Sequence, residues 1–88
     1  MREIAVPRDK LKVIVRSKQA RHFDGYAKSV TATNDVGEFD ILPAHANFVS
    51  LIKKRVTIDK GLESEKAFEL KKGVLAVKTN IVNVYLDL

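Results

Sequence analysis

Few residues in this chain could carry out acid–base or metal chemistry. It contains two histidines, His22 and His45, no cysteine, and no Gly-x-x-x-x-Gly-Lys phosphate loop. His22 and Asp24 are two residues apart, so on a strand they would share a face and could share a proton, although a solvated surface pair is the commoner arrangement. His45 could bind a metal, but a structural zinc site needs four nitrogen or sulfur ligands, which this chain does not supply. We therefore expect no catalysis, no metal and no other cofactor.

Two basic clusters, Lys53-Lys54-Arg55 and Lys71-Lys72, are the next candidates for binding chemistry. They could contact the phosphates of nucleic acid or of anionic lipid. Lysines at strand ends also stay in water and discourage edge-to-edge aggregation of sheets. We favour this second interpretation, because the four phenylalanines fall on predicted core faces and leave few aromatic rings for base stacking.

The net charge of +5 is unevenly distributed. Residues 1–28 carry eight basic and three acidic side chains, and residues 53–88 carry eight and five. Residues 29–52 instead contain three acidic side chains and no lysine or arginine. A stand-alone basic β-domain that binds nucleic acid is the alternative function that this charge permits. The acidic island argues against it, because such a domain more often gathers basic residues around its distinctive loop.

The elements that must position these residues are strands. Alternating apolar and polar residues, with turn signals every 8–12 positions, predict an antiparallel β-sandwich of about eight to ten short strands. No segment has helical periodicity over 11 residues. We expect strands at residues 10–17, from 22 onward, 28–33, 38–41, 47–58 with a break near 53–55, 65–70, 74–78 and 81–86. The last two would form a hairpin at Thr79-Asn80.

The length of 88 residues allows one domain, residues 1–88, with a single core. No apolar run reaches the length of a signal peptide core or a membrane span, so we expect a soluble protein.

Residues 37–46, Gly-Glu-Phe-Asp-Ile-Leu-Pro-Ala-His-Ala, are the most distinctive stretch. Phe39 and Ile41 alternate with acidic residues as in a half-buried strand, and Pro43 should end that strand in a turn. The stretch resembles the signature of the epsilon subunit of F-type ATP synthases, called delta in mitochondria, in which Gly-Glu-Phe-Gly-Ile-Leu-Pro-x-His-Ala is typical. The resemblance covers roughly residues 11–88 and implies the same β-sandwich.

The resemblance also implies a function. The family is a non-catalytic connector in the central stalk, which couples the gamma shaft to the membrane ring during proton-driven ATP synthesis. In the family the residues after the proline turn lie towards gamma, and here these are His45, Ala46, Asn47 and Phe48. Asn47 departs from the family, which more often has proline there.

A second contact implied by the resemblance is with the ring. In the family, the loop that holds the glutamate of Gly-Glu-Phe-Gly faces the polar loops of the ring. Glu38 takes that place here, and Asp35 and Asp40 add negative charge. Asp40 replaces the family's second glycine, so the strand should be stiffer and carry one more charge.

Many epsilon subunits continue past the sandwich into two helices that can inhibit ATP hydrolysis and in some bacteria bind ATP. This chain ends at residues 84–88, where the family's last sandwich strand ends, so we expect a subunit that neither inhibits by helix insertion nor binds ATP. The resemblance implies a location on the cytoplasmic face of a bacterial plasma membrane, or the inner face of an organelle. The contact with the membrane would be indirect, through the complex.

Overall fold

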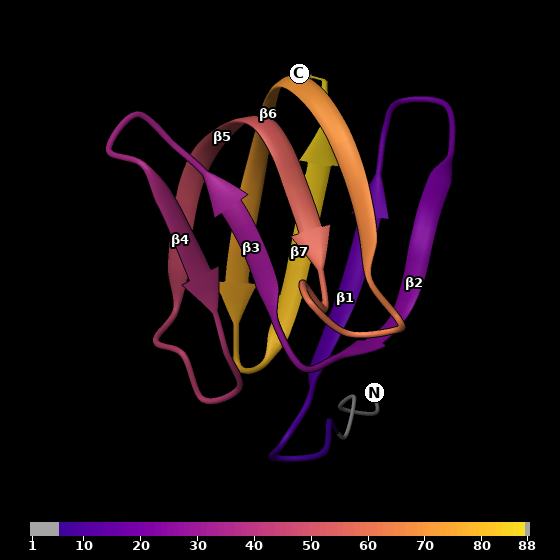
Figure 1. Cartoon of the computed structure of the whole chain (residues 1–88), viewed down its shortest axis with the longest axis vertical. Coiled ribbons are helices and arrows are strands. Elements are labelled where there is room, and N and C mark those ends of the chain that lie inside the picture. The colour runs from indigo at the N-terminus through magenta and orange to yellow at the C-terminus, as the bar shows by residue number, and fades with distance from the viewer. Residues whose placement is uncertain (1–5, 88) are drawn as a thin grey trace, which may run out of the picture.

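The computed structural model describes residues 6–87 and contains seven strands over that range (Figure 1). Residues 1–5 and 88, which the expected domain of residues 1–88 included, lie outside the described residues. The strands are β1 (Leu11–Arg16), β2 (Arg21–Ala27), β3 (Val30–Thr33), β4 (Glu38–Ile41), β5 (Phe48–Ile58), β6 (Lys66–Lys78) and β7 (Ile81–Leu86). We find no helix within residues 6–87 that has the length and apolar character of a membrane span.

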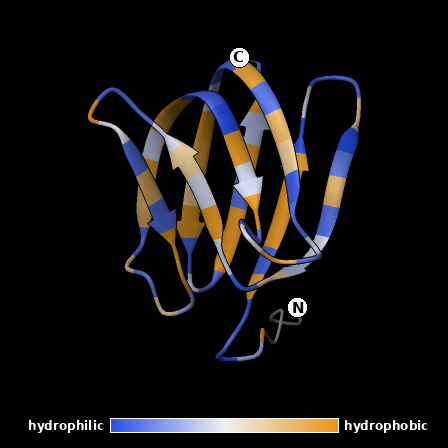
Figure 2. Ribbon diagram, in the orientation of Figure 1, coloured by the Kyte–Doolittle hydropathy of each residue, from blue (hydrophilic) through white to orange (hydrophobic). Residues whose placement is uncertain are grey.

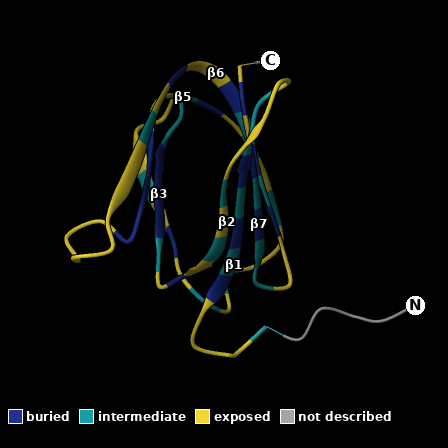
Figure 3. Cartoon of the chain, turned by 90° about the vertical axis from the view of Figure 1, so that its right-hand side faces the viewer, coloured by how far each residue is buried: buried dark blue, intermediate teal, exposed yellow. Residues whose placement is uncertain are grey.

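All seven strands belong to one sheet, in the order β2-β1-β7-β6-β5-β3-β4. The sheet folds back on itself, so that two layers face each other (Figures 1 and 3). Neighbouring strands are antiparallel except β1 and β7, which are parallel. The expected all-β sandwich is therefore confirmed, with one parallel pair where the sequence predicted only antiparallel pairs. That pair forms because the β1–β2 and β6–β7 hairpins lie side by side and bring the first and last strands together.

The two layers are joined by β5 and β6, which both bend over from one layer into the other at the top of Figure 1. In β5 the bend is a bulge between Ile52 and Lys54, and Lys54 takes a positive φ of 70°. In β6 the bend falls at Gly73, where a Cβ would collide with the backbone oxygen of Tyr85 and lie 2.6 Å from the Cδ1 atom of Leu70. The breaks expected at these two places are bends within continuous strands, so the structure has seven strands instead of eight to ten.

The core lies between the layers. Alternation of hydropathy along the strands (Figure 2) matches alternation of burial (Figure 3), as in a sheet with one inward face. The four phenylalanines are partly buried and pack against this core, as the sequence predicts. The fully buried side chains with the largest volumes are Leu11, Ile41, Ile58, Leu75, Val13, Val15, Val30, Val56, Val82 and Val84.

Candidate functional site

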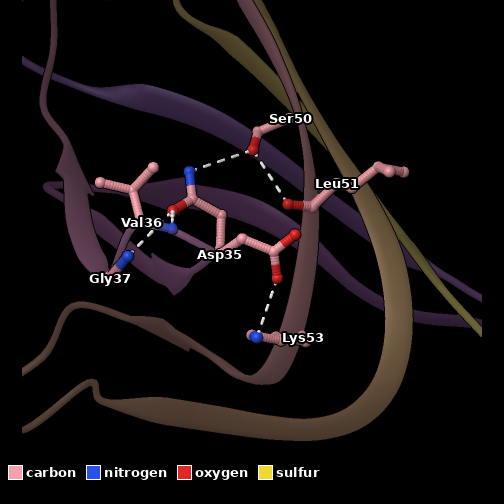
Figure 4. Close-up of polar contacts among 7 residues, drawn as sticks. Asp35, Val36, Gly37, Ser50, Leu51 and Lys53 are labelled. Carbon is pink, nitrogen blue, oxygen red and sulfur yellow. Dashed lines mark hydrogen bonds and ion pairs between the residues drawn. The ribbon is translucent and has the colours of Figure 1, made fainter.

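The β3–β4 hairpin carries the residues that the sequence assigned to the ring. Its turn is closed by two backbone hydrogen bonds between Asn34 and Gly37, of 3.0 and 3.2 Å. The side-chain oxygen of Asn34 also accepts hydrogen bonds from the amides of Val36 and Gly37. The amide nitrogen of the same side chain donates to the Ser50 hydroxyl on β5, at 3.3 Å (Figure 4). The tip of the hairpin is therefore attached to the first half of β5.

Two of the predicted acidic residues are ion-paired. Asp35 lies 2.9 Å from the ammonium group of Lys53 (Figure 4), and Glu38 lies 3.0 Å from that of Lys60. The hydrogen bond from Lys53, together with its positive charge, lowers the pKa of the Asp35 carboxyl below its usual range. The acidic island of the sequence is thus partly neutralised in the folded protein by cations from β5 and from the turn after it.

Asp40 faces Thr31 across the β3–β4 pair and accepts a hydrogen bond of 2.6 Å from its hydroxyl. The structure therefore brings Asp35, Glu38 and Asp40 onto one hairpin. Each of them already has a polar partner within the chain, which the sequence did not reveal.

The loop predicted to meet the gamma shaft lies at the opposite end of β4 (Figure 1). It begins with the turn 42–45, which a 3.1 Å backbone hydrogen bond closes and in which Ala44 has a φ of 69°. The side chain of Asn80 accepts a hydrogen bond of 2.7 Å from the Ala44 amide. Asn47 accepts one of 3.1 Å from the Thr79 amide. Two asparagines thus hold this loop against the β6–β7 turn, which explains why asparagine can stand at position 47.

The four residues assigned to the shaft differ in exposure. Phe48 is half-buried and makes edge-to-face contacts with Phe39 and His45, at centroid distances of 5.6 and 5.7 Å. The Nδ1 atom of His45 lies 2.7 Å from the backbone oxygen of Ala46. Ala46 and Asn47 are exposed. We infer that His45 and Phe48 shape the loop and that Ala46 and Asn47 present its surface.

A surface that the sequence reasoning missed lies on the outer side of the layer containing β7, β6 and the first half of β5. Val49 and Leu51 are 71% and 70% exposed there, and Tyr85 is 39% exposed. Strand register places Val49 opposite Ala76, and Leu51 and Tyr85 on either side of Val74. We call these five residues the outer apolar face. The sequence of β5 could have indicated this face, because apolar residues occupy both the inward and the outward positions of that strand.

The pair of His22 and Asp24 considered for proton sharing does not form. The His22 ring lies 2.9 Å from the Ser17 hydroxyl, whereas Asp24 pairs with Lys12 at 2.6 Å and Arg21 at 2.9 Å. The hydrogen bond from Lys12 and the two positive charges lower the pKa of the Asp24 carboxyl. Within residues 6–87 no three side chains of the metal-binding types gather into a cluster.

A sheet of seven strands that folds over into two facing layers defines the class of this chain as an all-β sandwich domain. Residues 10–87 match the family described as ATP synthase, Delta/Epsilon chain, beta-sandwich domain. The chain belongs to this family, and the resemblance seen in the sequence is confirmed.

Individual relatives agree with the family. The chain is 42% identical over 48 residues to an ATP synthase epsilon chain of a Nitratiruptor species, a match that covers 54% of this chain and 37% of the relative. It superposes with a TM-score of 0.80 and 13% identity on a chain of the mitochondrial ATP synthase of Euglena gracilis, covering 96% of this chain and 54% of that one.

A chain from the central stalk and c-ring of the Tetrahymena thermophila mitochondrial ATP synthase gives a TM-score of 0.69 and 16% identity, covering 92% of this chain and 66% of that one. At such identities the structural likeness shows the fold. The chain spans about one third to two thirds of the length of these three proteins. Neither the family nor these matches supports the nucleic-acid alternative.

Proposed function

We propose that this chain is a non-catalytic subunit of the central stalk of an F-type ATP synthase. Its role is to couple the gamma shaft to the membrane ring during proton-driven ATP synthesis. The observation that carries the proposal is the family match over residues 10–87. The domain would be associated with the membrane through the complex, on the cytoplasmic face of a bacterial plasma membrane or the inner face of an organelle.

A coupling subunit must transmit torque without deforming, and the connections between the two layers support that role. β5 and β6 each pass through both layers, so the layers are joined covalently by two strands at the bend. Asp59 adds a polar connection, because its carboxylate accepts hydrogen bonds from the backbone amides of Lys28 and Ser29 and from the Ser64 hydroxyl. It thus ties the β2–β3 connection to the β5–β6 turn.

The outer apolar face supports a contact with gamma. Exposed apolar residues that adjoin one another on a sheet mark a protein-binding surface more often than isolated ones do. Arg16 stacks over Tyr85 at 5.3 Å, and tyrosine and arginine are enriched among the residues that dominate binding energy. The exposed Ala46 and Asn47 lie just before β5, so the proline-turn loop extends the same contact.

The β3–β4 hairpin supports a contact with the ring through Asp35, Glu38 and Asp40. Because Lys53 and Lys60 already pair with two of these acids, a cation of the ring would have to compete with them. Such an exposed ion pair contributes about 0.2–1 kcal/mol, and its main effect is on orientation and encounter rate.

Co-expression with a gamma subunit tests the proposed function. We expect the two chains to purify together as a 1:1 complex. Leu51→Glu should abolish co-purification, because it places a charge within the outer apolar face, next to Val74. Leu62→Glu is the matched control, since Leu62 is 45% exposed but lies in the β5–β6 turn. Failure of the unmodified chain to bind any gamma subunit of its own synthase would contradict the proposal.

A further inference from the structure

The bend where β5 and β6 cross between the layers is rich in lysine. We call residues 53–55 of β5 and 71–73 of β6 the arch (Figure 1). The tip of the β3–β4 hairpin lies at the same end of the sandwich, attached to β5 by the Asp35–Lys53 ion pair and the hydrogen bond to Ser50 (Figure 4). A partner that approaches this end of the sandwich would therefore meet both the hairpin tip and the arch.

Two hollows flank the centre of the arch. One, of about 750 Å³, lies between the hairpin and the arch and is lined by residues that include Asp35, Leu51 and Lys53. The other, of about 740 Å³, is lined by residues that include Lys54 and Asp87. Lys71 and Lys72 line both hollows, so they form the ridge between them.

This end of the sandwich carries more basic side chains than acidic ones. The arch contributes Lys53, Lys54, Arg55, Lys71 and Lys72, against the carboxylates of Asp35, Glu69 and Asp87.

Two of those carboxylates are already in ion pairs, Asp35 with Lys53 and Glu69 with Arg55 at 3.5 Å. Among the residues that the structure describes, the other three lysines of the arch form no ion pair. At the tip of the neighbouring hairpin, Val36 is 96% exposed. Flexible lysines beside an exposed apolar side chain are a composition suited to the surface of an anionic bilayer.

We propose that this end of the sandwich contacts the membrane around the ring, and that Lys71 and Lys72 bind the headgroups of anionic phospholipids. The inference rests on the proposed function, which turns the hairpin towards the ring and so turns the arch towards the bilayer. Lysine suits such a ligand, because its compact charge on a long stem does not require one fixed phosphate geometry. A diffuse contact of this kind imposes no register and is compatible with a stalk that rotates.

The contact is weak for each lysine, at about a fivefold gain in membrane affinity. In the complex, attachment to the ring holds the domain beside the bilayer, so the effective lipid concentration is high and weak contacts suffice. The binding should weaken with salt, because exposed charges are screened beyond about 10 Å at 0.1 M.

Vesicle co-sedimentation of the purified 88-residue chain tests the proposal. We expect binding to phosphatidylcholine vesicles that contain about one third phosphatidylglycerol, and none to pure phosphatidylcholine. Lys71→Gln with Lys72→Gln should lower the partition coefficient about 25-fold. Lys28→Gln with Lys78→Gln is the matched control, because it removes the same charge where the β2–β3 connection and the β6–β7 turn lie, at the end opposite the arch (Figure 1). It should change binding less than about twofold.

Equal losses in the two double variants would show attraction by net charge alone and overturn the proposal. Equal binding to neutral vesicles would overturn it too, since adsorption would then be apolar. So would binding of duplex DNA in place of vesicles, with the same dependence on Lys71 and Lys72, because the arch would then be a nucleic-acid surface. Thermal unfolding monitored by circular dichroism verifies that each variant is folded.

A second measurement reports which end approaches the bilayer. The chain has no tryptophan, so Val36→Trp provides a single tryptophan at the hairpin tip, which can be excited at wavelengths where tyrosine does not absorb. We expect its emission to shift to shorter wavelength when charged vesicles are added. An unchanged spectrum under conditions where the chain co-sediments would place this end away from the lipid and overturn the proposal.

Failure of this inference is distinguishable from failure of the proposed function. If the chain co-purifies with gamma but ignores charged vesicles, the lipid contact is wrong and the stalk role stands. If it binds vesicles through Lys71 and Lys72 but no gamma subunit, the lipid contact stands and the stalk role is wrong. The Lys71→Gln, Lys72→Gln variant should still co-purify with gamma, because these lysines lie outside the outer apolar face.

Discussion

Asp59 joins the β2–β3 connection to the β5–β6 turn through one buried carboxylate. It is 6% exposed and receives hydrogen bonds from two backbone amides and one hydroxyl, at 2.6, 3.3 and 2.7 Å. Its own φ is 53°, a conformation that aspartate and asparagine tolerate better than most residues. In a domain this small, one such connection is a large share of the total stability.

We predict that Asp59→Ala lowers the free energy of unfolding by about 2 kcal/mol, because it leaves two partly buried amides and the Ser64 hydroxyl without their acceptor. Asp59→Asn should cost less, since it keeps one acceptor oxygen and tolerates the same φ. Glu63→Ala, an exposed acidic residue in the same turn, should stay within about 0.5 kcal/mol. Urea unfolding measures all three, and equal stability of the Asp59→Ala and Glu63→Ala variants would refute the role given to Asp59.

The Asp35–Lys53 pair makes a prediction about pH. Lys53 lowers the pKa of Asp35 in the folded state, so the pair stabilises the fold above the ordinary carboxyl pKa of about 3.9. That contribution is lost as the pH falls through the lowered value. In Lys53→Met the pKa of Asp35 should return to its ordinary range, and in Lys54→Met it should not change. Carboxyl carbon NMR titration of the three proteins decides the point, and an unchanged Asp35 titration in Lys53→Met would disprove the pairing in solution.

The bend of β6 depends on the absence of a side chain at one position. Gly73 sits against the backbone of β7 and the side chain of Leu70, so any larger residue must push the two strands apart. We predict that Gly73→Ala destabilises the domain by about 2–3 kcal/mol through this overpacking. Gly25→Ala is the control within a strand, because its new Cβ would meet only the Phe23 ring, at 3.2 Å. Thermal unfolding should separate the two variants clearly, and similar melting temperatures would contradict the overpacking.

The strands could be predicted because their signals are local. Alternation places β1, β3, β4 and β7 within one or two residues of their observed bounds. The sequence predicts breaks within the two long strands, β5 and β6, which are continuous in the structure. In β6 the reason is that Lys72-Gly73 has the composition of a turn. What distinguishes a bend from a turn here is the contact of Gly73 with β7, which is not visible along the chain.

The candidate site was predictable to a similar degree. The signature stretch located β4 and the proline-turn loop, because their residue types are distinctive in order and spacing. The ion pairs were not foreseen, because the lysine opposite Glu38 is 22 residues away in the sequence. The outer apolar face was missed because its members come from three strands, and only their register brings them together.

The candidate contacts lie at the two ends and on one side of the molecule, and the side adjoins the arch at Leu51. The sandwich extends 33 Å along its longest dimension, with the arch and the hairpin tip at one end and the proline-turn loop at the other (Figure 1). The outer apolar face lies on the side of one layer. A domain arranged in this way can meet a shaft along its side and a ring at its end, which are the two contacts that a coupling subunit needs.

The proposed contact with the ring predicts a pair of opposite effects, because Glu38 already pairs with Lys60 and a cation of the ring would compete for the same carboxylate. Glu38→Lys should loosen the attachment of the domain to its ring, most strongly at low salt, where exposed charges interact over a longer range. Lys60→Gln should have the opposite effect, since it removes the internal competitor at 3.0 Å and leaves the carboxylate available to the ring. Each change should amount to about 0.2–1 kcal/mol, or up to about fivefold in affinity.

Binding of the purified chain to the detergent-solubilised ring, measured over a range of ionic strength, tests both variants. Lys66→Gln is the control, because it removes an equal charge at an exposed position at the start of β6. If Lys60→Gln and Lys66→Gln weaken binding equally, the ring responds to the overall charge of the chain and Glu38 is not at the contact. If Lys60→Gln strengthens binding while Glu38→Lys weakens it, and both effects fade with salt, the β3–β4 hairpin is the part of the sandwich that faces the ring.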